Sequence, residues 1–283
     1  MVTVPDFHDL LGAADAWGAD HVGVAVVGPA GVVADHGELD RVFRWASVTK
    51  PVTALAALQA VDDRLIDLDE AAGPPDSTIR HLLAHTSGLP FDGTALLGAP
   101  GRRRIYSNTG FDLLGEIVAG RRGMPFDQVV REGILGPLGM TATSLVERPS
   151  QGLEGTLRDL ATLAREFLRP TLLRAATAAE MVAPAFPGVP GLVPGVGRFD
   201  DCAWGLGVEL RATKTPHWMG SRNGPAAFGH FGGTGTFLWV DPRLDLAVVA
   251  LTDRTYGPWA LEAWPRFSDT IIDRWSSRPP PRG

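Results

Sequence analysis

Valine-rich runs typical of β-strands lie near both ends of the sequence, and this arrangement limits the folds that the chain can adopt. Residues 22–37 contain two such runs around Gly28-Pro29-Ala30-Gly31, a combination that predicts a β-hairpin. Between about 67 and 200 the sequence shows short helical patterns instead of strand-like runs. Strand-like runs return near the other end of the chain, at 202–210, 235–240 and 246–252, the last two joined by the turn-forming segment 241–245.

Strands from both ends of a chain can share one sheet when the segment between them is an insertion. We therefore expect an α+β fold, with a mostly antiparallel sheet from both chain ends covered by helices, and an inserted helical subdomain. The expected domains are a sheet domain at 1–66 plus 200–276, a helical subdomain at 67–199 and a flexible tail at 277–283. The Pro- and Gly-rich segment 183–200 is expected to form a loop or lid, and the cleft between the two parts is expected to hold the active site.

Charge and composition narrow the partners and the compartment. The formal net charge is −6 and the arginines are scattered, which argues against a nucleic-acid partner. The single cysteine, Cys202, does not indicate an oxidising compartment. It could be a nucleophile, but the expected role is that of a small apolar residue beside a strand. The apolar runs are too short to span a membrane and the N-terminal segment lacks the basic start of a signal peptide, so we expect a cytoplasmic protein with no membrane partner.

A Ser-x-x-Lys motif, Ser47 and Lys50, opens a helix that is expected to run to about Asp62. Residues three positions apart share one face of a helix, so the two side chains can approach each other. A lysine acts as a base only when its pKa falls toward neutrality, and burial can cause this. The motif is short, and Ser47 could be a helix cap beside a solvated Lys50. The chain has 24 arginines but only two lysines, which favours a lysine that must lose its proton, because arginine cannot.

Two further motifs extend the pattern. Tyr106 and Asn108 form a Tyr-x-Asn at the start of a predicted helix, and His230 opens "HFGGTG" before a late strand. Together with Ser-x-x-Lys and "IRHLLAHTSGLP" at 79–90, these motifs resemble the serine β-lactamase and penicillin-binding protein superfamily, in its class C branch. The resemblance covers about residues 20–275, and a His-x-Gly third motif is similar to the D-aminopeptidases and esterases of that branch.

The resemblance implies a role for each motif residue. Ser47 would form an acyl-enzyme, Lys50 would take or share its proton, and Tyr106 would move protons to the leaving group and from water. Asn108 and His230 would bind substrate beside Gly232 and Gly233, and the amides of Ser47 and Gly233 would form the oxyanion hole. No cofactor and no metal are implied.

The implied activity is that of a serine hydrolase acting on a small ester or on an amide of a D-amino-acid-type substrate. A neutral His230 replaces the lysine that β-lactamases usually carry there, so penicillin turnover is less expected. The alternatives are a β-lactam-hydrolysing enzyme, a β-lactam-binding sensor that acylates with little turnover, and an acyltransferase. The sequence leaves the oligomeric state open.

One other candidate site has metal-ligand spacing. His81 and His85 are four residues apart, as in helical zinc sites. The intervening residues lack the glutamate of His-Glu-x-x-His, and no third ligand is evident. Structural roles are therefore expected for both histidines.

Overall fold

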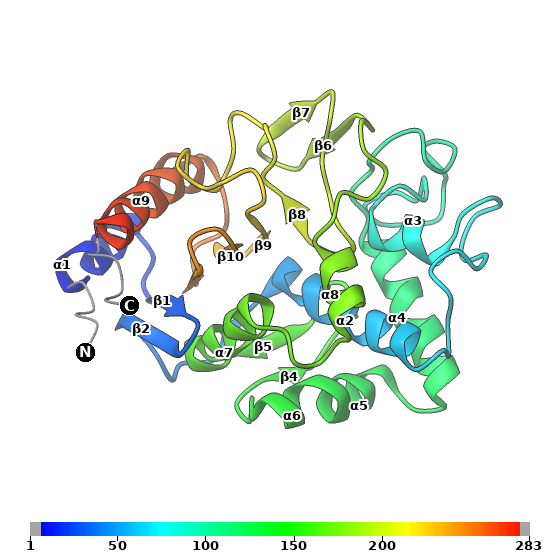
Figure 1. Cartoon of the computed structure of the whole chain (residues 1–283), viewed down its shortest axis with the longest axis horizontal. Coiled ribbons are helices and arrows are strands. Elements are labelled where there is room, and N and C mark those ends of the chain that lie inside the picture. The colour runs from blue at the N-terminus through cyan, green and yellow to red at the C-terminus, as the bar shows by residue number, and fades with distance from the viewer. Residues whose placement is uncertain (1–6, 278–283) are drawn as a thin grey trace.

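A six-stranded antiparallel sheet forms the centre of the computed structural model, which describes residues 7–277 (Figure 1). Its strand order is β2-β1-β11-β10-β9-β8, so the first hairpin lies against the last strand of the chain. The strands are β1 (Val22–Gly28), β2 (Gly31–Gly37), β8 (Glu209–Leu210), β9 (Phe228–Gly232), β10 (Thr236–Asp241) and β11 (Leu246–Thr252). Both predicted hairpins, β1–β2 and β10–β11, are confirmed.

The register of β1 against β11 joins the two ends of the chain. Val24 is opposite Ala250 and Val26 is opposite Val248, and all four side chains are buried on one face of the sheet. Their alternate neighbours are buried on the other face, so both faces are covered. The predicted α+β fold, with a sheet from both chain ends covered by helices, is confirmed.

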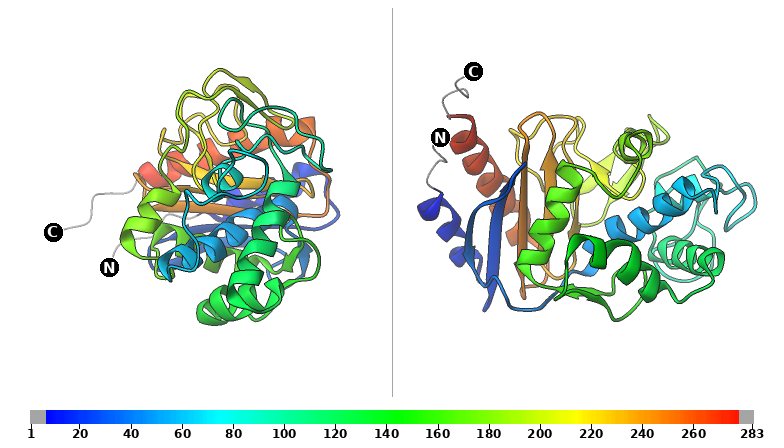
Figure 2. Two further views of the ribbon diagram at one scale, coloured as in Figure 1. Left: turned by 90° about the vertical axis from the view of Figure 1, so that its right-hand side faces the viewer. Right: turned by 60° about the horizontal axis from the view of Figure 1, so that its bottom comes forward.

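Helices cover the sheet on both sides, as the right-hand view of Figure 2 shows. The terminal helices α1 (His8–Leu11), η1 (Gly12–Trp17) and α9 (Pro258–Ser276) lie on one face, where aromatic side chains dominate the contact. Helix α7 (Leu157–Leu168) packs on the other face against β1, β10 and β11. Helix α7 lies within the segment predicted as the helical subdomain, 67–199. It nevertheless packs on the sheet and forms one layer of the sheet's core.

The remaining helices surround a buried central helix. The predicted helix from Ser47 to Asp62 is present as η2 (Ala46–Val48) and α2 (Thr49–Asp62), and α2 is buried along most of its length. Contacts from α4, α5, α8 and β9 enclose it, which explains why apolar residues and alanines occupy all its sides. The other helices are α3 (Ile79–Leu83), α4 (Asn108–Arg122), α5 (Phe126–Val130), the π-helical turn η3 (Arg131–Leu135), α6 (Gly136–Leu138) and α8 (Ala175–Met181).

Two small antiparallel sheets complete the described structure. One consists of β3 (Phe43–Arg44), β5 (Leu153–Gly155) and β4 (Ser144–Leu145), and it lies at the start of the segment that carries Ser47. The other is the hairpin of β6 (Gly191–Val193) and β7 (Gly197–Phe199), inside the segment expected to be a loop or lid.

One local prediction differs from the structure. The strand expected over 202–210 is confined to β8, because Gly207 adopts a positive φ of 87° and the backbone passes too close to Ala54 for any side chain. His230 precedes the predicted strand β10, as expected, and itself lies within β9, a strand that the sequence did not predict. The domain boundaries at 66/67 and 199/200 stay predictions, and the expected tail lies outside the described residues except for Ser277.

A buried charge cluster holds the loop after β8. Glu209 accepts hydrogen bonds from Lys214 Nζ (2.5 Å), His217 Nε2 (3.1 Å) and Trp218 Nε1 (2.7 Å), and all four side chains are buried. Although burial opposes ionisation, the charge of Lys214 and the hydrogen bonds from His217 and Lys214 hold the pKa of Glu209 below its usual range. Both lysines of the chain are thus buried, each with its own polar partners.

Replacing Lys214 by methionine is expected to lower the free energy of unfolding by about 3–5 kcal/mol, because it leaves the Glu209 carboxylate buried without its ammonium partner. Chemical denaturation at neutral pH measures this. The double variant Lys214→Met/Glu209→Gln removes both charges and should recover most of the loss. If the free energy of unfolding of Lys214→Met lay within about 1 kcal/mol of the wild-type value, the loss would be typical of a surface ion pair. Such a result would contradict a buried ion pair between Lys214 and Glu209.

Candidate active site

Ser47 lies at the start of the buried central helix, on a short 3-10 turn that leaves its side chain partly exposed. The preceding Ala46 has a positive φ of 46°, a backbone conformation that is unfavourable for any residue with a Cβ atom. This conformation turns the chain sharply into the helix. The carbonyl of Trp45 is held by Thr236 Oγ1 at 3.0 Å. The end of β9 approaches this turn closely. The constrained turn therefore presents the Ser47 hydroxyl toward the sheet.

Lys50 is fully buried and makes three polar contacts. Its Nζ lies 3.2 Å from Ser47 Oγ, 2.6 Å from Asn108 Oδ1 and 2.9 Å from the carbonyl oxygen of Ser150. The ring of Tyr106 lies 4.7 Å from the same nitrogen. The predicted approach of Ser47 and Lys50 on one helix face is present in the structure.

Burial lowers the pKa of Lys50 to about 7, and the carboxylates of Asp112 and Asp92 oppose this shift. The contacts also suit an uncharged amine. A neutral amine has two N–H donors and one lone pair, and two of its three partners, the Asn108 and Ser150 carbonyl oxygens, can only accept. The lone pair is then left for the proton of Ser47. The geometry can therefore support proton transfer from the hydroxyl to the amine near neutral pH.

Tyr106 and Asn108 flank the N-terminus of α4. Ser107 is the N-cap, and its Oγ accepts a hydrogen bond from the amide of Gly110 at 2.9 Å. This cap fixes the first turn, so that Asn108 reaches Lys50 while the Tyr106 side chain lies in front of it. The Tyr106 ring packs against His85, with ring centroids 4.5 Å apart and planes tilted by 33°, and edge-on to Trp204 at 6.1 Å.

The Tyr106 hydroxyl faces Ser47 and His230. Burial raises the pKa of Tyr106 well above its usual value, although a hydrogen bond with Ser47 opposes this, so the phenol stays protonated. Burial, together with the charge of Lys50, lowers the pKa of His230 to about 3. The imidazole is therefore neutral, and its Nδ1 donates to the carbonyl of Phe231 at 2.8 Å. Its Nε2 is left to accept from the Tyr106 hydroxyl, 3.5 Å away.

The glycines after His230 differ in their surroundings. A Cβ at Gly232 would lie 2.5 Å from the carbonyl oxygen of Trp45, so only glycine permits this approach of β9 to the turn that carries Ser47. A Cβ at Gly233 would find no atom within 4 Å, so open space lies beside that residue. The structure thus brings together all seven residues singled out in the sequence.

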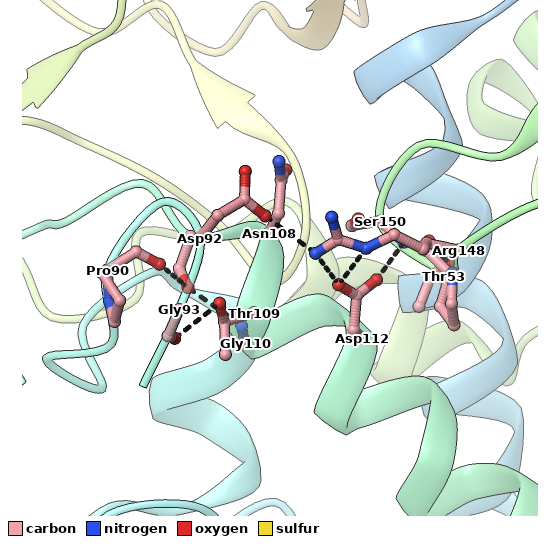
Figure 3. A network of polar contacts seen from close by, with 12 residues as sticks. Thr53, Pro90, Asp92, Gly93, Asn108, Thr109, Gly110, Asp112, Arg148 and Ser150 are labelled. Atoms are coloured by element: carbon pink, nitrogen blue, oxygen red, sulfur yellow. Dashed lines mark hydrogen bonds and ion pairs between the residues drawn. The ribbon is translucent and has the colours of Figure 1, made fainter. Parts of the chain in front are cut away.

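A polar network behind Lys50 was missed by the sequence analysis (Figure 3). Arg148 donates to Asp112 Oδ2 (2.8 Å, from Nε) and to Asp92 Oδ1 (2.8 Å). The other oxygen of Asp112 accepts from the Ser150 amide at 3.0 Å, and the Ser150 carbonyl accepts from Lys50. On the opposite side, Thr53 Oγ1 donates to the carbonyl of Pro149 at 2.5 Å. These bonds hold the loop 148–150 in place against Lys50.

His85 and Trp204 were also missed as parts of the site wall. His85 Nδ1 accepts from the amide of Ser107 at 3.0 Å, which ties the ring beneath Tyr106. Trp204 meets His85, Tyr106 and His230 edge-on. The spacing of His81 and His85 suggested only a metal site, and no local pattern marks Trp204. The roles of both residues depend on neighbours more than 20 residues away.

The other candidates have structural surroundings. His81 Nδ1 accepts from the amide of Thr78 at 3.2 Å and completes a capping box of α3, while the ring of His85 lies against Tyr106, so the two histidines serve different neighbours. Burial raises the pKa of the Cys202 thiol to about 11, which disfavours the nucleophilic thiolate. Among residues 7–277, no helix is long and apolar enough to cross a membrane, and the expected cytoplasmic location stays a prediction.

Comparison with solved structures supports this reading of the fold. The chain matches a beta-lactamase from Mycobacterium bovis with a TM-score of 0.92 and 46% identity, over 94% of this chain and 99% of the other. It matches EstCE1, described as a hydrolase with promiscuous acyltransferase activity, with a TM-score of 0.76 at 18% identity, over 93% of this chain and 97% of that one. The second likeness shows the fold alone.

Curated relatives match a smaller part of the chain. Protein Rv1367c of Mycobacterium tuberculosis is 32% identical, over 37% of this chain and 39% of its own length. AmpH of Escherichia coli, a D-alanyl-D-alanine-carboxypeptidase/endopeptidase, is 30% identical over 40% of this chain and 39% of its own length. The match with these relatives thus spans about two fifths of their length. The family model described as Beta-lactamase matches residues 13–269. The chain therefore belongs to the beta-lactamase family, within the superfamily of serine β-lactamases and penicillin-binding proteins.

Proposed function

We propose that this chain is a serine hydrolase that forms an acyl-enzyme on Ser47 and cleaves a small ester or an amide of a D-amino-acid-type substrate. The observation that carries the proposal is the buried Lys50, whose pKa of about 7 and contact with Ser47 Oγ at 3.2 Å suit a general base.

In the acylation step, Ser47 Oγ attacks the substrate carbonyl and its proton passes to the neutral amine of Lys50. The amides of Ser47 and Gly233 stabilise the oxyanion of the tetrahedral intermediate, a contribution of about 3 kcal/mol or more in comparable sites. The Tyr106 phenol donates its proton to the leaving oxygen or nitrogen as the bond breaks. Lys50 then returns a proton to the Tyr106 oxygen.

In the deacylation step, water enters beside Tyr106 and attacks the ester formed on Ser47. The proton of the water passes through Tyr106 and Lys50, and the other product is the free acid. Ser47 recovers its proton as the acyl group leaves. During both steps, the 2.6 Å contact between Asn108 Oδ1 and Lys50 Nζ holds the amine in position.

A substrate panel tests this proposal directly. A p-nitrophenyl ester, a D-aminoacyl p-nitroanilide and nitrocefin are assayed with the wild type, and intact mass is measured during turnover. We expect ester or anilide hydrolysis with a mass increase equal to the acyl group. No turnover and no adduct with any of the three would refute the proposal.

A β-lactam is the second candidate substrate, because the 46% identical protein from Mycobacterium bovis is described as a beta-lactamase. The neutral His230 weighs against it, since an uncharged imidazole binds the carboxylate of a penicillin less firmly than an ammonium does. Nitrocefin turnover in the same panel, with the ester and the anilide left intact, would favour the β-lactam.

The dependence of acylation on pH follows from Lys50. The amine accepts a proton only when it is neutral, so kcat/KM should fall about tenfold per unit below pH 7 and level off above it. No second decline is expected until the Tyr106 phenol ionises at strongly alkaline pH, because burial raises its pKa. Initial rates across pH, with the Ser47→Ala rate subtracted, measure the profile. A flat profile between about pH 5 and 8 would contradict Lys50 as the base.

Asp112 is a positioning residue for Lys50, and Asp92 provides a matched control. Both carboxylates bind Arg148 and both raise the pKa of Lys50, but Asp112 alone holds the Ser150 amide. Either change to asparagine should move the rising limb of the pH profile to lower pH. We expect Asp112→Asn also to lower the kcat reached at high pH by about tenfold, with little change in KM. Asp92→Asn should keep the wild-type kcat at high pH. Equal plateaus in the two variants would contradict this role.

A further inference from the structure

A cavity of about 700 Å³ adjoins the active site on the far side of Tyr106, and its size is typical of a small-molecule site. Tyr106 lines the cavity with its ring, while its hydroxyl faces Ser47. The walls come from the segment before α4 and from the β6–β7 hairpin, which lie side by side where Arg104 pairs with Gly191 (Figure 1). A substrate bound at Ser47 can therefore extend past Tyr106 into this cavity.

The cavity is apolar around its mouth. Of the seven large hydrophobic side chains that are exposed in residues 7–277, three line it: Phe91 (51% exposed), Leu97 (58%) and Leu192 (43%). Phe91 also stacks on Tyr106, with ring centroids 5.9 Å apart. Exposed hydrophobic residues that gather in one place mark a binding surface, whereas scattered ones need no explanation. An apolar part of the substrate suits this surface.

Two arginines add positive charge to the same walls. Arg104 is buried and donates to the carbonyls of Cys202 and Ala185, which fixes the strand-like segment and turns the side chains of Arg103 and Ile105 to the cavity. Arg198 projects from β7 opposite Leu192 and lines it too.

Neither the Arg103 nor the Arg198 guanidinium has a polar partner among residues 7–277. Their side chains make no ion pair or hydrogen bond with any residue that the structure describes, although the chain as a whole carries a net charge of −6. Asp200 is the one carboxylate among the lining residues, so the cavity wall stays positive overall. Unpaired guanidinium groups next to an apolar surface are complementary to a carboxylate at the end of an apolar chain.

We propose that this cavity selects substrates in which an apolar segment next to the scissile bond ends in a carboxylate, bound by Arg103 and Arg198. The inference rests on the proposed attack by Ser47 and narrows its substrate class. In this proposal Arg103 and Arg198 bind the substrate carboxylate. The neutral His230 lies near the reacting carbonyl and does not bind the carboxylate.

Two matched esters test the proposal. p-Nitrophenyl hexanoate and the mono-p-nitrophenyl ester of adipic acid have the same acyl chain length, and the second ends in a carboxylate. A second arm uses the hexanoate of a nitrophenol that bears a carboxylate, which puts the charge on the leaving group. Each kcat/KM is divided by the rate of hydroxide hydrolysis of that ester. At low salt we expect the normalised kcat/KM of the wild type to be about tenfold higher for one of the charged esters than for the neutral hexanoate. A preference for the adipate ester would place the acyl group in the cavity. A preference for the carboxylated nitrophenyl ester would place the leaving group there.

The variants separate the arginines from the rest of the surface. Arg103→Ala/Arg198→Ala should remove the preference and leave the rate on the neutral ester near wild type. Arg102→Ala is the matched control, because Arg102 is an exposed neighbour that does not line the cavity. Asp200→Asn should increase the preference, and salt should reduce it in the wild type. A preference that is absent in both arms, or that survives in the double variant, would overturn the proposal.

Failure of this inference can be told apart from failure of the proposed function. If fluorophosphonate labels wild type but not Ser47→Ala and neutral esters are hydrolysed, the nucleophile stands and only the charge selection fails. If the two proteins label equally, the assignment of Ser47 fails first.

Discussion

Alanine in place of Ser47 is expected to abolish covalent labelling by a fluorophosphonate and to lower kcat on the best ester by about 10⁴-fold or more. In the proposed mechanism the Ser47 oxygen forms the bond to the acyl group, and alanine removes that oxygen. Lys50 and Tyr106 can still polarise water, so a small residual rate is expected. Intact-mass spectrometry measures labelling, and steady-state kinetics measures the loss.

Ser221→Ala serves as the control for the Ser47 prediction. Its hydroxyl bonds to Asp269 at 2.7 Å, away from the residues of the site, so labelling and rate should match the wild type. The Ser47 variant should also unfold at the wild-type temperature, because it loses one partly exposed oxygen. Full labelling of Ser47→Ala would show that another residue is the nucleophile.

Arginine in place of Lys50 is expected to lower kcat/KM by about 10³-fold. Arginine keeps the positive charge but cannot give up its proton, so it cannot take the proton of Ser47. The pKa of about 7 at Lys50 depends on complete burial, and the larger guanidinium must be accommodated in the same enclosed space. The measurement is the acylation rate at pH values above 7, where the wild-type amine is neutral.

Lys50→Met guards against a simple folding defect in the arginine variant. Methionine is close to lysine in shape and is apolar, so it suits a buried position and should leave the fold intact. It lacks a base, and its acylation rate should be as low as that of the arginine variant. If Lys50→Arg kept more than about a tenth of the wild-type rate, Lys50 would not be the base.

The strand and hairpin pattern was predictable because it depends on local periodicity. Valine-rich runs, and turn residues at 28–31 and 241–245, are properties of short segments, and their positions at both chain ends predicted the shared sheet. The same reasoning failed at 202–210, where the expected strand is confined to β8. The close passage of Gly207 over Ala54 turns the backbone there, and a contact between residues 153 positions apart leaves no local pattern.

The candidate site was predictable in identity but not in environment. The spacing of Ser47 and Lys50 implied their contact, since helix geometry alone places them together. Tyr106, Asn108, His230 and the glycines were reached through resemblance to a family. Ser150 contacts Lys50 only through its backbone carbonyl. Such a contact does not depend on the type of side chain, so no sequence motif could identify Ser150.

The rarity of lysine suggested a special role for Lys50, yet the structure buries both lysines and gives them different neighbours. Lys214 lies 2.5 Å from the Glu209 carboxylate, whereas Lys50 meets a hydroxyl, an amide oxygen and a peptide carbonyl. By itself, the order of residues predicted the sheet and the proximity of Lys50 to Ser47, and it pointed to Ser47 as the candidate nucleophile. Only the tertiary structure decided that this amine has a pKa near neutrality, because desolvation is the summed effect of every group that the fold places around it.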